Sequence, residues 1–213
     1  MRINYIDYLK VVALLLMTFY HYEFITFFFS GFQLTQIHEV LGFIARFLFL
    51  FLFGVHYRTY TAAGASKFLK LALAALIITL FSTVFFPSYT IVFGVIHFFL
   101  VCSLLFRFYQ KFLYVLGYLS VMSLFIQFPY ASNNWFLILG FTTSDFMSFD
   151  YFPIFPYFSY VFAGIAFNDY FISKNKIPFD LPKSHLVRFV AKHSLLYYLL
   201  HVPIILLVRY MTM

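Results

Sequence analysis

Two ionisable side chains in the first apolar segment, Lys10 and His21, are placed where they could carry acid–base chemistry within a membrane. Eleven positions separate them, which is about three turns of α-helix, so both lie on one face roughly 16 Å apart along the axis. Asp7, three positions before Lys10, continues the same stripe. Ionisable groups in membrane segments are rare because lipid penalises them, and they often mark substrate paths or proton relays. The stripe therefore predicts a functional site.

Further polar residues interrupt later apolar segments. Arg46 lies too deep in its segment for easy snorkelling, so we favour a functional role such as stabilising an oxyanion. His97 lies in another segment. Near the C-terminus, His201 shares a face with Ser194 and with Tyr197 or Tyr198. For Asp150 and the stripe ending at His201, helix capping and contacts between helices are the slightly favoured explanations.

The sequence shows no pattern typical of a metal site, a disulfide or a nucleotide-binding site. His21, His97 and His201 include no HxxxH or HxH pair, so we expect no metal site. The single cysteine, Cys102, lies in an apolar segment, which excludes an internal disulfide. The chain contains no GxSxG, Walker or dinucleotide-binding motif.

The composition is that of a multi-pass membrane protein. The 213 residues are 64% hydrophobic and only 10% charged, whereas about a quarter of a soluble domain is charged. The apolar segments use the whole length, so we predict one domain spanning residues 1–213. The formal charge of +7 arises from basic residues between apolar segments, where they set topology, and we expect no nucleic-acid partner.

Apolar segments of about the length that a bilayer requires predict an all-α bundle of about seven transmembrane helices. They cover residues 9–29, 40–57, 68–87, 90–107, 112–129, 152–171 and 190–210. The first, third and fifth loops lack Lys and Arg, while the N-terminus and the other loops carry most of the basic residues. Positive charge marks the cytoplasmic side, so we expect a cytoplasmic N-terminus and a location in the plasma membrane.

Several segments resemble a known family in order along the chain. The opening NYIDYLKVVALLLMTFYH, with Asp7, Lys10 and His21, is similar to the first span of membrane-embedded acyltransferases. The other matching segments are ARFLFLFLFG (45–54), GVIHFF (94–99), DYFPIFPYFSYVFAGIAF (150–167) and KHSLLYYLLHVPI (192–204). Together they resemble the bacterial and archaeal relatives of heparan-alpha-glucosaminide N-acetyltransferase.

The resemblance implies transfer of an acyl group, usually acetyl, from acyl-coenzyme A to a sugar hydroxyl or amine. It offers two histidines as the base. His21 occupies the first-span position, and His38 is the nearest counterpart of the histidine proposed as catalytic in the first outer loop of the eukaryotic enzyme. Val11 departs from the family, which usually has Gly after the basic residue.

We therefore expect an acyl-coenzyme A-dependent acyltransferase in which neutral His21 acts as general base. Lys10, helped by Arg58 or Lys67, would hold the donor's phosphates or pantetheine path. Residues expected to line the acceptor side are His97, Asp150, Tyr151 and His201. A proton-coupled transporter using the same buried groups, a non-catalytic partner that kept the fold, and assembly as a homo-oligomer all stay open.

Overall fold

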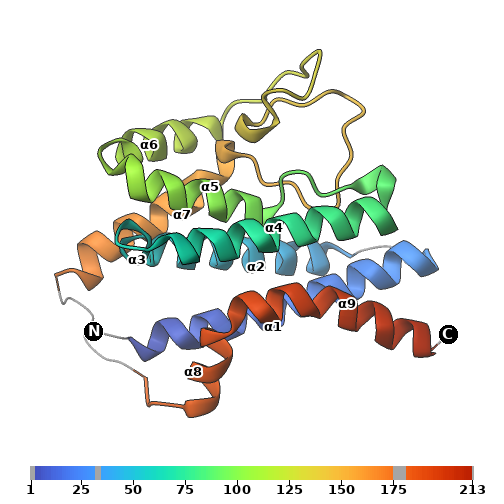
Figure 1. Ribbon diagram of the computed structural model, residues 1–213, viewed down its shortest axis with the longest axis horizontal. Helices are drawn as coiled ribbons and strands as arrows, with labels where there is room; N and C mark the ends of the chain where they lie inside the picture. The colour runs from blue at the N-terminus through green and yellow to red at the C-terminus, as the bar shows by residue number, and fades with distance from the viewer. Residues whose placement is uncertain (1–2, 32–34, 175–180, 213) are drawn as a thin grey trace. The chain divides into compact units, whose positions relative to one another are not determined.

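The computed structural model describes residues 3–31, 35–174 and 181–212, and these form helices joined by irregular segments without any β-strand (Figure 1). The chain contacts divide it into two compact units. Unit 1 contains Met1–Leu52 and Phe171–Met213, and unit 2 contains Phe53–Tyr170. The all-α class expected from the apolar segments is confirmed for the described part of the chain.

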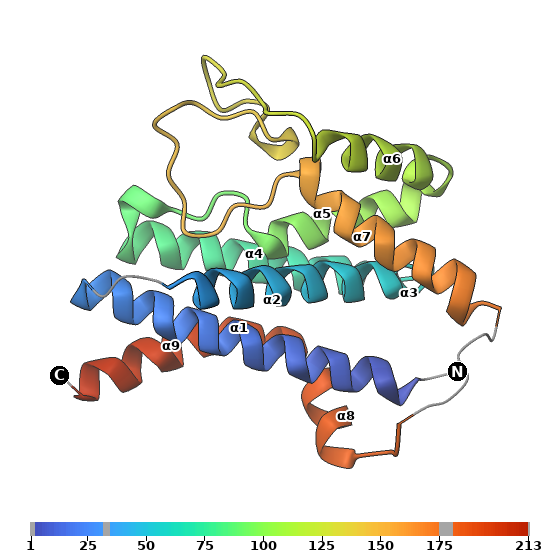
Figure 2. The ribbon, with the colours of Figure 1, turned by 180° about the vertical axis from the view of Figure 1, so that it is seen from behind.

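Unit 1 is built on α1 (Asn4–Ser30) and α9 (Ser194–Thr212), which pack against each other although they come from opposite ends of the sequence (Figure 2). It also holds α8 (His185–Lys192), which packs on α1, and α2 (Gln36–Val55) as far as Leu52. Leu14, Met17 and Ala45 form a buried cluster covered by Leu16, Phe49, Val190, Tyr197 and Tyr198. This cluster fixes the α1–α9 contact that positions the histidines described below.

Unit 2 contains α3 (Arg58–Thr61), α4 (Ala65–Phe85), α5 (Val95–Phe108), α6 (Leu113–Ser123) and α7 (Ile154–Phe167). Helix α5 packs on α3 and α4, and α6 packs on α7. Short 3-10 helices lie in the connections at Pro87–Tyr89, Gln110–Phe112 and Leu137–Leu139, and a π-helix, Asn168–Ile172, follows α7. The core of unit 2 is formed by the fully buried side chains of Phe98, Cys102, Phe106, Phe158, Val161 and Ile165.

Gly54 allows α2 and α7 to approach closely within unit 2. A Cβ atom at this position would lie 2.0 Å from the carbonyl oxygen of Val161. Real side chains do not tolerate such a contact with backbone, so no other residue fits here without moving a helix.

In the described part of the chain, four helices are long and apolar enough to cross a membrane: α1, α2, α4 and α9. Helix α5 and the segment Gln110–Ser123 pass the same test only as a pair, bent by 106°, so the count reaches at most five. Each of the seven predicted segments contains a helix, but α7 rises only about 21 Å, less than the hydrocarbon core of roughly 30 Å. Seven complete spans thus stay a prediction.

Candidate functional site

The central feature of unit 1 is a contact between two histidines from α1 and α9. Nδ1 of His21 lies 3.2 Å from Nε2 of His201, and the two rings meet edge to face. Nδ1 of His21 also lies 2.9 Å from the Met17 carbonyl oxygen, and Nδ1 of His201 lies 2.6 Å from that of Tyr198. Both imidazoles are thus anchored to the helix that carries them.

These distances determine where the protons sit on the neutral pair. A carbonyl oxygen only accepts, so Nδ1 of each histidine must carry hydrogen and donate. The Nδ1–H of His21 is then shared between the Met17 carbonyl and the lone pair of His201 Nε2. Among the described residues, no group hydrogen-bonds Nε2 of His21. This nitrogen therefore holds a lone pair that can accept a proton from a ligand.

A tyrosine and a threonine extend the polar stripe beside this pair. The Tyr197 hydroxyl lies 2.8 Å from Oγ1 of Thr18, which itself donates to the Leu14 carbonyl oxygen at 2.8 Å. The Tyr197 ring is nearly parallel to that of His201. Sequence reasoning placed Tyr197 or Tyr198 on the His201 face but missed Thr18, although Thr18 precedes His21 by three positions and shares its face.

His38, the competing candidate base, has both ring nitrogens engaged. Its Nδ1 accepts from the backbone N–H of Thr35 at 3.2 Å and lies 2.9 Å from the Thr35 hydroxyl. Its Nε2 lies 3.3 Å from a Glu23 carboxylate oxygen. Helix α2 begins at Gln36, so His38 takes the place of the acidic partner in a capping box. Its lone pair is committed to the helix start.

Other site residues predicted for unit 1 lie on the same helices. Lys10 lies on α1, half-buried, and Asp7 one turn earlier is buried. Arg46 is half-buried on α2, directly after Ala45, which packs against Leu14 and Met17 of α1. Asp7, Lys10 and His21 thus lie on one helix, α1, and Asp7 and Lys10 near its start are at least partly buried.

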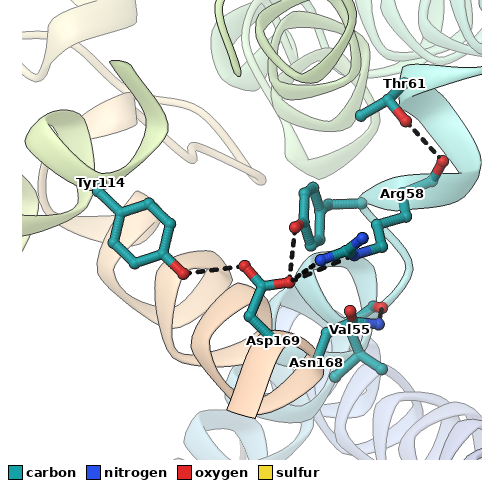
Figure 3. Close-up of polar contacts among 7 residues, drawn as sticks. Val55, Arg58, Thr61, Tyr114, Asn168 and Asp169 are labelled. Atoms are coloured by element: carbon teal, nitrogen blue, oxygen red, sulfur yellow. Dashed lines mark hydrogen bonds and ion pairs between the residues drawn. The ribbon is translucent and has the colours of Figure 1, made fainter. Parts of the chain in front are cut away.

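In unit 2, Arg58 belongs to a polar cluster centred on Asp169 (Figure 3). Oδ1 of Asp169 accepts hydrogen bonds from Nη2 of Arg58 and from the Tyr57 hydroxyl, both at 2.7 Å, while Oδ2 accepts from the Tyr114 hydroxyl at 2.9 Å. Hydrogen bonding to Asp169 raises the pKa of the Arg58 guanidinium, so it stays a cation. Asn168 next to it donates to the Val55 carbonyl. Sequence reasoning missed Asp169 because it is over a hundred residues away.

Lys67 supports the same turn from the start of α4. Its ammonium donates to the carbonyl oxygen and hydroxyl of Thr59 at 3.2 and 3.3 Å and lies 4.0 Å from the centroid of the Tyr60 ring. Arg107 of α5 also donates to this turn, at the Thr61 carbonyl oxygen. The cations Arg58, Lys67 and Arg107 therefore gather around the turn Arg58–Thr61, and each of them hydrogen-bonds a neighbouring protein group.

The residues expected on the acceptor side in unit 2 also make structural hydrogen bonds. Asp150 accepts from the backbone N–H of Val95 at 2.9 Å, which caps the start of α5. The Tyr151 hydroxyl donates to the Leu137 carbonyl oxygen at 2.6 Å, and burial raises its pKa to about 12, so it stays protonated at neutral pH. His97 contacts the Thr79 hydroxyl through Nε2 at 3.0 Å, while its buried Nδ1 has no partner among the described residues.

No group of three His, Cys, Asp or Glu side chains in the described ranges is arranged to hold a metal ion. The described residues offer two kinds of chemistry. A neutral imidazole with an available nitrogen lies on α1, and clustered cations that suit anionic groups lie around α3.

Comparison with known proteins adds a family to this geometry. A family model described as heparan-alpha-glucosaminide N-acetyltransferase, catalytic, matches residues 2–203. No curated protein and no solved structure matches the chain. Since the family model covers all but the ends of the sequence, the chain belongs to the family of the heparan-alpha-glucosaminide N-acetyltransferase catalytic domain.

Proposed function

We propose that the protein is a membrane-embedded acyltransferase that moves an acyl group, in first place acetyl, from acyl-coenzyme A to a sugar or another acceptor. Family membership supports the reaction class. The observation that carries the assignment to this chain's residues is the lone pair on Nε2 of His21, held in place by the contact with His201. We also propose that residues 1–213 act as one domain.

In this proposal, Nε2 of His21 takes a proton from the hydroxyl or amine of the acceptor. The oxygen or nitrogen of the acceptor attacks the thioester carbonyl as that proton leaves. The carbon–sulfur bond then breaks, and coenzyme A leaves as a thiolate that takes up this proton. The positive charge on His21 is stabilised at Nδ1–H by two acceptors, the Met17 carbonyl and His201. Arg46 on α2 would stabilise the oxyanion.

His21 is preferred to His38 because of what each imidazole already binds. The lone pair of His38 accepts from Thr35, and its other nitrogen faces Glu23. To act as a base, His38 would have to break its hydrogen bond with Thr35 at the start of α2. His21 can accept a proton at Nε2 without breaking a hydrogen bond. His38 is the alternative that the variants below distinguish.

Lys10 is proposed to bind the anionic part of the donor. The pantetheine arm is extended enough to cover the roughly 16 Å between Lys10 and His21 along α1. Lys10→Gln is therefore expected to weaken coenzyme A binding, measured by titration of the purified protein, whereas Lys10→Arg keeps the charge and should bind. Unchanged affinity in Lys10→Gln would reassign the donor to the cations around α3, where Arg58 and Lys67 are the next candidates.

For the acceptor we retain His97, Asp150, Tyr151 and His201 as proposed contacts. Support differs among them. His97 offers an unpartnered Nδ1, whereas Asp150 and Tyr151 already bond the backbone. A saccharide would suit these groups because hydroxyls both donate and accept.

We further propose seven spans in the cytoplasmic membrane with the N-terminus inside, based on the distribution of basic residues. Cysteines introduced at Ser66 or Ser173 should resist a membrane-impermeant thiol reagent in intact cells, and a cysteine at Ser144 should react. The native Cys102 is buried and gives a low background. Labelling at Ser66 or Ser173 would rule out this topology.

A proton-coupled carrier is the second candidate. It is favoured by the direct His21–His201 contact, which could pass a proton, and by the 106° break between α5 and the segment after it. A non-catalytic membrane partner is the third, supported by Val11 at the position where the family usually has Gly. Neither alternative predicts transfer of an acyl group from coenzyme A.

A further inference from the structure

Helix α8 has a different orientation from the long helices of unit 1. Both ribbon views show it lying across the direction of α1 and α9, close to the end where α1 begins (Figures 1 and 2). A short helix across the end of membrane-spanning helices lies near the plane of the bilayer surface. The position of α8 is thus that of an interfacial helix.

Hydrogen bonds fix α8 and the segment before it to the start of α1. Arg188 donates through Nη2 to the Asn4 side-chain oxygen at 2.6 Å, and Asn4 donates to the Leu181 carbonyl at 2.9 Å. Tyr8 reaches the Pro182 carbonyl oxygen at 3.2 Å. Because these contacts and the buried Ala191 define which face points inward, the opposite face is equally well defined.

That outer face combines large apolar side chains with cations. Leu186 and Phe189 are 73% and 63% exposed, and Lys192 beside them is exposed as well. Lys183 lies exposed just before the helix. Residues 181–213 contain no Asp or Glu side chain, so α8 itself carries basic and no acidic residues. Apolar side chains flanked by cations match the boundary between acyl chains and anionic headgroups.

We propose that the outer face of α8 binds an anionic lipid surface. Leu186 and Phe189 enter the acyl-chain boundary, while Lys183 and Lys192 contact the phosphates of acidic headgroups. The binding orients the start of α1, which carries Lys10, relative to the membrane surface. This inference does not depend on the proposed acyl transfer.

The test uses the fact that Trp135 is the single tryptophan of the chain. In a Trp135→Phe background, Phe189→Trp places one fluorophore on the outer face of α8. The protein is reconstituted into vesicles that hold a constant fraction of brominated phosphatidylcholine, while phosphatidylglycerol replaces unbrominated phosphatidylcholine in increasing amounts, and quenching is measured. We expect quenching to rise with the phosphatidylglycerol fraction, to fall with added salt, and to be insensitive to free inorganic phosphate at constant ionic strength.

Replacing both Lys183 and Lys192 by glutamine should weaken binding of α8 to the anionic surface by about 30-fold, about fivefold for each cation, and should move half-maximal quenching to a higher phosphatidylglycerol fraction. Lys70→Gln with Lys111→Gln removes the same charge from unit 2 and serves as the matched control, with no expected shift. If Phe189→Trp does not fold, Leu186→Trp reports from the same face. Quenching that is absent, or that is equal at all headgroup compositions, overturns the proposal.

Discussion

Replacing His21 by Ala is expected to lower acyl transfer by a factor of about 10²–10⁴, the usual loss when a general base is removed. Donor binding and folding should persist, because His21 is only half-buried and its removal leaves the cluster of Leu14, Met17 and Ala45 intact. The measurement is the rate of labelled acetyl transfer by purified protein, with coenzyme A affinity measured in parallel.

His38→Ala is the matched control, since it removes an imidazole from a helix start and not from the α1–α9 contact. Its transfer rate should stay near that of the unaltered protein, with a modest loss of stability from the missing cap of about 1 kcal/mol. A folded His21→Ala protein that transfers at the original rate would contradict the assignment, and loss of activity in His38→Ala alone would move the base to His38.

The second large effect is expected from Gly54→Ala. The added Cβ would meet the Val161 carbonyl oxygen at 2.0 Å, and neither atom belongs to a side chain that can rotate away. The helices must separate, so we expect a free energy of unfolding lower by about 3 kcal/mol or more, at the upper end of the range for overpacking. The fully buried Cys102 provides the readout, as the temperature at which it becomes reactive to a thiol dye in detergent.

Gly64→Ala provides the comparison for this substitution. A Cβ there meets nothing within 4 Å, so only the small preference of a helix start for Gly over Ala is lost. The midpoint of Cys102 reactivity should hardly move. Equal midpoints for the two variants would show that the close approach at Gly54 does not stabilise unit 2.

Helix positions could be predicted from the sequence because each apolar segment carries its own signal. The ranges predicted from hydropathy overlap α1, α2, α4 and α9, with the ends shifted by one to five residues. The connection between α5 and α6 lies where the gap between the predicted segments 90–107 and 112–129 placed it, but the 106° bend there was not predicted. A hydropathy pattern reports the length and polarity of a segment. It carries no information on the direction that the chain takes after a short connection.

For the candidate site too, positions within one helix could be predicted from the sequence, whereas contacts between helices could not. The periodicity of α1 correctly placed Lys10 and His21 on one helix, and the spacing in the last segment placed His201 on a polar face. That His21 and His201 touch could not be foreseen, because the contact joins residues 180 positions apart. For Asp150, the sequence favoured a cap of the helix that follows it, whereas in the structure its carboxylate accepts from the backbone N–H of Val95 at the start of α5.

The most direct test of the central claim is transfer of labelled acetyl from acetyl-coenzyme A by the purified protein in liposomes, with a panel of amino sugars and neutral sugars as acceptors. We predict labelled acceptor and stoichiometric free coenzyme A with the unaltered protein, and only background with His21→Ala. A correctly folded protein, with Cys102 protected, that neither labels any acceptor nor releases coenzyme A would contradict the account.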